Sequence, residues 1–109
     1  MKKHESKKFK LYTEAITGIK TLTPKEEREL FTKYKNPETP ENEKHRIREL
    51  IIISNLRLVL KIANEYCKGG IELEDLVSEG NIGLFHAVDR YKVNKTAKFS
   101  TYAAWWIKQ

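Results

Sequence analysis

The sequence is poor in cysteine, in proline and in long apolar runs, and each shortage excludes a class of protein. Its 109 residues include one cysteine, three prolines and three histidines. A single cysteine, Cys67, cannot form an intramolecular disulfide. The absence of such a disulfide weakly indicates a protein of the reducing cytosol. Scattered histidines with a single cysteine do not make a structural zinc set, so we expect no metal and no cofactor. No apolar run, Leu50–Ile53 included, approaches the ~18–20 residues of a membrane span, so we expect no membrane partner.

The usual catalytic arrangements are missing as well. We find no paired carboxylates, no serine–histidine arrangement and no glycine-rich phosphate loop, so we expect no enzyme activity. The first ten residues are rich in lysine but are followed by no apolar stretch, which excludes a signal peptide. We expect residues 1–10 to be a disordered basic tail. With 39% hydrophobic and 33% charged residues, the chain is typical of one soluble globular domain or a part of a larger protein.

The distribution of charge is more informative than the net charge of +6. Residues 71–89 contain five acidic residues and no basic one, whereas residues 90–109 contain five basic residues and no acidic one. A basic C-terminal segment favours binding to a polyanion such as a nucleic acid, and an acidic segment favours binding to a basic protein surface. Charge alone favours the simpler interpretation, that these are solvated helix faces.

The spacing of apolar residues predicts helices throughout and no convincing strand, so the predicted fold class is all-α. Thr23 and Glu26 form a predicted capping box with a proline between them, and Thr39-Pro40 repeats the start signal. Ser100 or Thr101 is the expected cap of the last helix. The predicted helices span residues 9–18, 24–35, 40–68, 72–91 and 101–109.

Two positions leave alternatives open within these helices. Asn55 is polar inside an apolar stripe that nearly surrounds the helix predicted over 40–68, so it either caps or kinks that helix or serves a ligand. Gly80 and Gly83 lie inside the helix predicted over 72–91, where each costs about 1 kcal/mol relative to alanine. We favour a continuous helix whose glycines allow the close approach of a neighbour near Ala87. The alternative is a break at Gly80–Asn81.

The last helix carries the most informative side chains. At 100° per residue, Phe99, Ala103 and Ile107 form a docking face. The adjoining arc holds three large aromatic residues and an amide, preceded by Lys92, Lys95 and Lys98. Aromatic rings flanked by cations suit unpaired nucleic-acid bases, since stacking contributes about 1–3 kcal/mol per base. The alternative is that both tryptophans belong to the core. The residues of this arc are Tyr102, Trp105, Trp106 and Gln109.

Four motifs together resemble a known family. The strings NLRLVLKIA (55–63), DLVSEGNIGL (75–84), AVDRY (87–91) and KFSTYAAWWIKQ (98–109) resemble the second conserved region of bacterial RNA polymerase sigma factors of the housekeeping (sigma-seventy) family, in order and in spacing. Residues 11–23 resemble the short helix and turn that precede that region. The resemblance covers residues 11–109 and implies a compact bundle of about five helices. It implies linker helices over 11–38 and a region 2 core domain over 39–109, truncated within its last helix.

The resemblance implies a polymerase-binding surface in the acidic segment. In the family, the Asp-Leu-x-x-Glu-Gly motif docks on the clamp helices of the β′ subunit of core RNA polymerase. The residues that the resemblance places at this surface are Glu74, Asp75, Ser78, Glu79, Asn81 and Ile82.

The resemblance also implies binding of the non-template strand of the promoter minus-ten element. Tyr102, Trp105 and Trp106 would stack on, or wedge behind, a flipped adenine at the second position. Arg90, Lys95 and Lys98 would hold phosphates, while Gln109 would lie at the upstream base pair. Tyr12 would face the discriminator DNA just downstream. A second flipped base, the last thymine of the element, would enter a pocket near Asn55, Leu58, Ser100 and Thr101.

The function implied is that of a sigma factor, or a fragment of one, which binds core RNA polymerase and recognises and melts the minus-ten element. The family places such a protein in the cytoplasm at the nucleoid, and an anti-sigma factor is a further partner that the resemblance allows. Two alternatives stay open. One is a polymerase-binding regulator that does not open promoters, and the other is a helical domain that binds single-stranded DNA without base preference.

Overall fold

The computed structural model describes residues 7–67, 72–93 and 98–109, and these residues form helices joined by short segments. No strand occurs in these ranges, so the predicted all-α class is confirmed there. The molecule is elongated, with principal extents of 51 × 25 × 21 Å. The helices are α1 (Lys7–Thr17), α2 (Pro24–Lys35), α3 (Glu41–Ser54), α4 (Leu56–Tyr66), α5 (Leu73–Arg90) and α6 (Phe99–Lys108).

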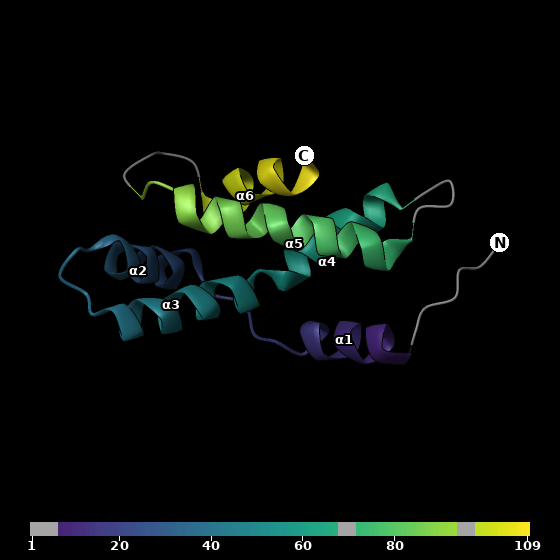
Figure 1. Ribbon diagram of the computed structural model, residues 1–109, viewed down its shortest axis with the longest axis horizontal. Helices are drawn as coiled ribbons and strands as arrows, with labels where there is room; N and C mark the ends of the chain where they lie inside the picture. The colour runs from purple at the N-terminus through teal and green to yellow at the C-terminus, as the bar shows by residue number, and fades with distance from the viewer. Residues whose placement is uncertain (1–6, 68–71, 94–97) are drawn as a thin grey trace.

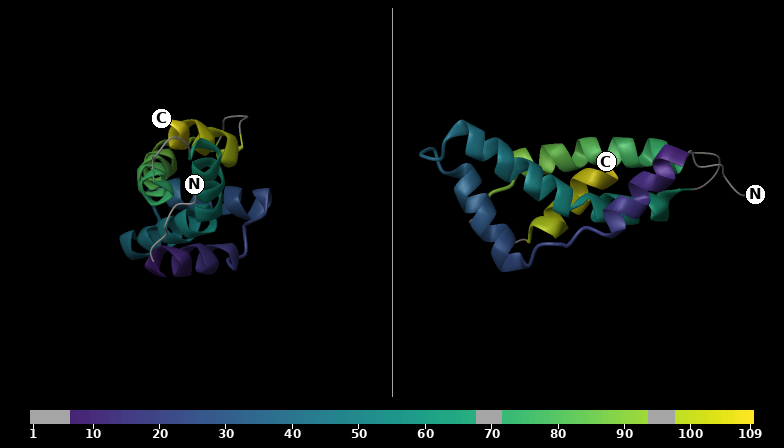
Figure 2. Two further views of the ribbon diagram at one scale, coloured as in Figure 1. Left: turned by 90° about the vertical axis from the view of Figure 1, so that its right-hand side faces the viewer. Right: turned by 90° about the horizontal axis from the view of Figure 1, so that it is seen from below.

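Helix α5 is the centre of the packing, because it contacts α3, α4 and α6. Figure 1 shows α5 running along the length of the molecule beside α4 and the shorter α6. Helices α2 and α3 pair at one end, whereas α1 lies toward the other end and contacts α4 (Figure 2). The buried side chains at the centre are aliphatic and small: Val59, Ile62, Leu84, Ala87, Val88, Ala103 and Ile107.

The predicted close approach at the glycines of α5 is confirmed. A Cβ atom placed on Gly83 would lie 2.5 Å from the carbonyl oxygen of Trp106, and one on Gly80 would lie 2.8 Å from Cγ1 of Val59. Helix α5 is continuous through both glycines, so the alternative break at Gly80–Asn81 is wrong. The two glycines therefore set the distance from α5 to α6 and to α4.

The helix starts were predicted with mixed success. The capping box of α2 is confirmed, since the Glu26 amide donates to Thr23 Oγ1 at 3.1 Å and the Thr23 amide donates to Glu26 Oε1 at 2.9 Å. Thr39 is not the cap of α3, because its hydroxyl donates to the Lys33 carbonyl at the end of α2. Helix α6 begins one residue after Lys98, whose side chain makes no capping bond. The predicted caps at Ser100 and Thr101 are therefore wrong.

The single helix predicted over 40–68 is also wrong, because it is divided into α3 and α4 at Asn55. Asn55 has φ −112° and ψ 6°, between the helical and extended regions. Its backbone N–H donates hydrogen bonds to the carbonyls of Ile52 and Ile53. The capping or kinking role left open for Asn55 is thus observed. The predicted helix stop at Gly69-Gly70 lies outside the described residues.

The N-terminal helix begins earlier than expected. Helix α1 starts at Lys7, so residues 7–10, which we assigned to a disordered tail, are helical. Phe9 and Ile16 are the buried residues on the inner face of α1. Within the described ranges, no helix has both the length and the apolar character that a membrane crossing requires, and no group of three or more His, Cys, Asp or Glu side chains is placed to hold a metal ion.

Candidate nucleic-acid and protein interfaces

Helix α6 is sharply divided into two faces. Phe99, Ala103 and Ile107 are buried against the rest of the molecule, as the spacing predicted. On the other side the indole of Trp105 is 58% exposed. Tyr102 and Trp106 are half-buried between the two faces, whereas Gln109 is exposed. Helix α6 therefore presents an aromatic surface while its docking face holds it in place.

Trp106 is held by rings and a cation from two sides. Its ring lies 5.3 Å from that of Trp105 in an edge-on arrangement and 5.3 Å from the His86 ring. The guanidinium of Arg90 lies 5.1 Å from the Trp106 ring centre, close enough for a cation–π interaction. The indole Nε1 of Trp106 is buried and has no hydrogen-bond acceptor among the described residues. Trp106 thus combines a fixed ring with an unused donor.

Tyr102 and Gln109 complete the aromatic surface. The Tyr102 hydroxyl donates to the carbonyl of Arg90 at 3.5 Å, and its ring lies 5.6 Å from that of Tyr91. The Gln109 side chain donates to the Trp105 carbonyl at 3.2 Å. Both contacts tie the outward-facing side chains to the backbone of α5 or α6. The predicted set Tyr102, Trp105, Trp106 and Gln109 is therefore brought together on one helix face, with Arg90 beside it.

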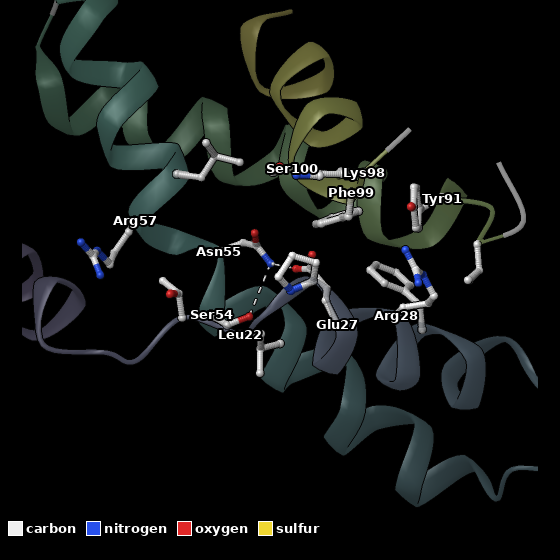
Figure 3. A pocket seen from close by; sticks show the side chains of 15 residues that line it. Leu22, Glu27, Arg28, Ser54, Asn55, Arg57, Tyr91, Lys98, Phe99 and Ser100 are labelled. Carbon is white, nitrogen blue, oxygen red and sulfur yellow. Dashed lines mark hydrogen bonds between the residues drawn. The ribbon is translucent and has the colours of Figure 1, made fainter. Parts of the chain in front are cut away.

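A pocket of about 300 Å³ opens beside this face, between α2, α4 and the start of α6. Figure 3 shows its side chains converging from these helices and from the segment before α2. Phe31, Tyr91 and Phe99 form an aromatic cluster in its wall, with ring centres 4.8–5.2 Å apart. Such a volume is at the lower end of small-ligand sites. The pocket can hold one flat group against a rigid aromatic wall.

The polar centre of the pocket is the pair formed by Asn55 and Glu27. The Asn55 amide donates to Glu27 Oε2 at 3.0 Å and to the Ile51 carbonyl at 2.8 Å. Burial raises the pKa of the Glu27 carboxyl above its ordinary value of 4.5, and the hydrogen bond from Asn55 partly opposes this shift. Figure 3 shows the Asn55 amide directed at the Glu27 carboxylate inside the pocket. Both residues can offer hydrogen bonds to a polar ligand edge.

Most of the residues predicted for the second flipped base do line this pocket. Asn55, Leu58 and Ser100 are among its lining residues, and Lys98 lies at its edge. Thr101 is exposed on α6 and is not one of them. Lys95 lies outside the described residues.

The sequence reasoning missed several contributors to this pocket, among them Glu27 and Arg28 of α2. Neither carried a signal in the sequence, because charged residues are mostly exposed and look like ordinary helix surface. The packing of α2 against α3, which ends at Asn55, brings Glu27 into contact with that residue. The capping box that fixes the start of α2 also fixes the position of Glu27, since it directly precedes Glu27.

A second surface is formed by the outer face of α5. Five of the six residues predicted for protein binding are exposed on it: Glu74, Asp75, Ser78, Glu79 and Ile82. Phe85 continues the same face at 39% exposure. Acidic side chains around exposed apolar ones suit a protein partner with a basic, partly apolar surface.

Asn81 is placed differently from its neighbours. Its side chain is half-buried and donates to the Tyr12 hydroxyl of α1 at 3.3 Å, while its Oδ1 atom is buried without a partner among the described residues. The Tyr12 ring also stacks on Phe9 at 5.9 Å. Tyr12, predicted to face DNA, therefore packs between α1 and α5, and the structure does not bring it together with the pocket of Asn55.

Comparison with known proteins identifies the family. The family model described as Sigma-70 region 2 matches residues 51–109, which is more than half of the chain. This range contains α4, α5, α6 and the pocket residues Asn55, Leu58 and Ser100.

The chain belongs to the sigma-70 family.

Two curated relatives agree with this assignment. The chain is 48% identical over 68 residues to RNA polymerase principal sigma factor HrdD of Streptomyces coelicolor, which covers 62% of the chain and 20% of the relative. It is 39% identical over 100 residues to RNA polymerase sigma factor SigA of Clostridium acetobutylicum, which covers 92% of the chain and 25% of the relative. The sigma-70 resemblance is therefore confirmed, and the chain spans about a fifth to a quarter of the length of these relatives.

Proposed function

We propose that this sigma-70 chain binds core RNA polymerase and recognises and opens the minus-ten element of promoters as part of transcription initiation. The reaction involves no bond chemistry by the chain itself. It consists of holding separated bases outside the DNA stack while the polymerase is held nearby. The observation that carries this proposal is the pairing of an exposed aromatic face on α6 with an adjacent polar pocket, on a domain of the sigma-70 family.

The DNA-binding part of the proposal uses the outer face of α6. Trp105 and Tyr102 stack on the adenine of the second position, with Trp106 behind them. Flipping a base out of a duplex costs a few kcal/mol, which stacking and hydrogen bonds to the extruded base must offset. The amide of Gln109 can make such bonds when it releases the Trp105 carbonyl, whereas the buried Nε1 donor of Trp106 becomes accessible only if its ring moves. Arg90, Lys95 and Lys98 supply the positive charge that phosphates require.

The pocket of Asn55 receives the second flipped base, the last thymine of the element. A pyrimidine edge carries both donors and acceptors, and the pair of Asn55 and Glu27 offers an amide and a carboxylate 3.0 Å apart. Leu58 and the aromatic wall contact the base faces, while Ser100 lines the pocket from the start of α6. Binding requires Asn55 to exchange its bond to Glu27 for bonds to the base.

The polymerase-binding part uses the outer face of α5, whose acidic residues would face the clamp helices of the β′ subunit. Its five exposed candidate residues include three carboxylates and Ile82, whereas the sixth candidate, Asn81, is half-buried. An anti-sigma factor would compete for this same face. These partners would place the chain at the nucleoid in the cytoplasm.

The decisive experiment measures fluorescence anisotropy of a labelled non-template oligonucleotide that carries the minus-ten element. A matched oligonucleotide has its second-position adenine replaced, and both are titrated with and without core polymerase. We expect binding that depends on polymerase and weakens by about 1–3 kcal/mol on the base change. Equal binding of the two oligonucleotides would favour a DNA-binding domain without base preference. Polymerase binding without any DNA binding would favour a regulator that does not open promoters.

A further inference from the structure

The last turn of α5 is anchored to both α2 and α3 through one residue, Asp89. The Asp89 carboxylate accepts hydrogen bonds from Nε and Nη2 of Arg48 on α3, at 2.9 and 3.2 Å, and from the Tyr34 hydroxyl of α2 at 3.2 Å. Its backbone carbonyl accepts a further bond from Nζ of Lys35 at 2.8 Å. Figure 1 shows this end of α5 beside α2 and α3. Side chains from two helices thus converge on Asp89.

The contacts of Asp89 fix a geometry more than they add stability. A carboxylate in the last turn of a helix lies near the negative end of the helix dipole, where a cation is favoured. The two bonds from Arg48 reach different oxygens of Asp89, Oδ1 and Oδ2, and such a bidentate pair sets orientation as well as distance. The Asp89 side chain is 49% exposed, so the pair adds little to the free energy of unfolding. Its main effect is to hold the end of α5 in place.

The two residues that follow Asp89 contact the aromatic surface of α6. The Arg90 carbonyl accepts the hydrogen bond from the Tyr102 hydroxyl at 3.5 Å, and the Arg90 guanidinium lies 5.1 Å from the Trp106 ring centre. The Tyr91 ring lies 5.6 Å from the Tyr102 ring. Successive carbonyls of α5 are therefore bonded to α2 and to α6. Because a peptide unit is planar and rigid, a movement of Asp89 also moves the Arg90 carbonyl.

We propose that Asp89 is a positioning residue for the aromatic surface: by fixing the last turn of α5 to α2 and α3, it holds Arg90 where Arg90 orients Tyr102 and Trp106. Asp89 itself touches no base and acts through Arg90. This inference rests on the proposed function, because the oriented rings are those that would stack on the flipped adenine. Rings that are held before the base arrives need not be ordered on binding, and this lowers the entropic cost of the complex.

The test uses variants that loosen this anchor and one that does not. Asp89→Asn removes the charge at nearly constant size, and Arg48→Gln removes its partner. Glu43→Gln is the matched control, because Glu43 of α3 pairs with Lys33 of α2 at 3.4 Å and so joins the same two helices without the bonds to α5. Circular dichroism melts set a temperature at which all the chains are fully folded, and every measurement is made there.

The first measurement is tryptophan fluorescence of the free chain. The sequence contains only two tryptophans, Trp105 and Trp106, and both lie on α6. In a Trp105→Phe background the emission reports on Trp106 alone. We expect Asp89→Asn and Arg48→Gln to shift this emission to longer wavelength and to increase its quenching by acrylamide, because the Trp106 ring loses its fixed cation. The double variant should change no further, and Glu43→Gln should match the parent.

The second measurement is binding of the minus-ten oligonucleotide and of its matched partner with the second-position adenine replaced, in the presence of core polymerase and with Trp105 intact. Asp89→Asn should bind the adenine oligonucleotide about fivefold more weakly, because side chains that the parent holds in advance must then be ordered. Binding of the replaced oligonucleotide should hardly change, since it depends on phosphate contacts. Affinity for polymerase should also be kept, since Asp89 lies at the opposite end of α5 from Glu74 and Asp75.

The positioning role is overturned if the Trp106 emission stays unchanged, if both oligonucleotides lose affinity equally, if adenine selectivity is kept, or if Glu43→Gln behaves like Asp89→Asn. Losses that add up in the double variant would overturn the action of Asp89 through its pair with Arg48. The proposed function fails on a different result, a parent chain without adenine preference. In that case the fluorescence of the free chain still decides whether Asp89 orients Trp106.

Discussion

Gly83 of α5 lies directly against the backbone of Trp106 of α6. A Cβ atom at Gly83 would be 2.5 Å from the Trp106 carbonyl oxygen and 2.9 Å from its carbonyl carbon. Backbone atoms cannot rotate away as a flexible side chain can, so the two helices must separate if this glycine is replaced. The position of the proposed base-stacking residues therefore depends on a glycine in the helix that carries the proposed polymerase-binding face.

Replacing Gly83 by alanine should destabilise the fold, although alanine is the better helix former by about 1 kcal/mol. Overpacking against a backbone typically costs 1–3 kcal/mol, which outweighs that gain. Gly80→Ala should cost less, because its nearest atom is a side-chain methyl of Val59 at 2.8 Å. Gly18→Ala is the control, since its nearest neighbour is 3.6 Å away. Urea unfolding measures all three. A Gly83→Ala chain as stable as the parent would contradict the close packing.

The sequence could predict this contact only in part. Two glycines beside Ala87 indicated that a neighbour approaches closely, and the period of α6 indicated its buried face. Which residue meets Gly83 is decided by how α5 and α6 dock, and a single sequence carries no signal for that. The same limit applies to Asn55: its polarity indicated a break or a ligand, whereas its partner Glu27 lies 28 positions away. The sequence therefore indicated that these positions are special, but it did not indicate which distant residue contacts each of them.

Asn55→Ala should destabilise the fold by about 1–3 kcal/mol, because it leaves the partly buried Glu27 carboxylate without its donor. The loss should be smaller in a Glu27→Gln background, since a neutral amide costs less to bury than a charge. A double-mutant cycle from urea unfolding measures this coupling. Additive effects of the two substitutions would show that the hydrogen bond contributes nothing to stability.

Glu27 should also make stability fall as the pH rises. Burial raises the pKa of its carboxyl in the folded chain above the ordinary 4.5. The folded state therefore binds the proton more tightly, and this contribution is present below pH 4.5 and lost as the pH rises through the raised value. We expect Glu27→Gln to be more stable than the parent at pH 7, with a difference that shrinks toward pH 4. An unchanged difference across this range would exclude burial of the charge as its cause.

Asp89 should make stability fall as the pH decreases, which is the opposite of the effect of Glu27 and occurs at lower pH. Its carboxylate accepts hydrogen bonds from Arg48 at 2.9 and 3.2 Å and from the Tyr34 hydroxyl at 3.2 Å. The bond from Arg48 lowers the Asp89 pKa below its ordinary 3.8. The resulting stability is present above pH 3.8 and lost as the pH falls through the lowered value.

The Asp89 side chain is 49% exposed, so we expect a loss of no more than about 1 kcal/mol. Melting curves of Asp89→Asn should accordingly lie below those of the parent at pH 6 and approach them near pH 2. Glu43→Gln is the matched control, because its ion pair with Lys33 is longer, at 3.4 Å, and lies on the surface. If the two variants changed the melting temperature equally, the hydrogen bonds around Asp89 would stabilise the fold no more than a surface ion pair does.

Trp105 provides the clearest separation of binding from folding. Its side chain is 58% exposed, so Trp105→Ala should leave the free energy of unfolding nearly unchanged. If it stacks on an unpaired base, the same substitution should weaken binding of the minus-ten oligonucleotide by about 1–3 kcal/mol in the presence of core polymerase. Tyr66→Ala of α4 is the control, since Tyr66 is also an exposed aromatic residue, at 52%, and lines neither proposed DNA site. Anisotropy titrations of both variants distinguish the two positions. Equal binding by Trp105→Ala and the parent would remove the stacking role, and equal losses in both variants would point to general hydrophobic attraction instead.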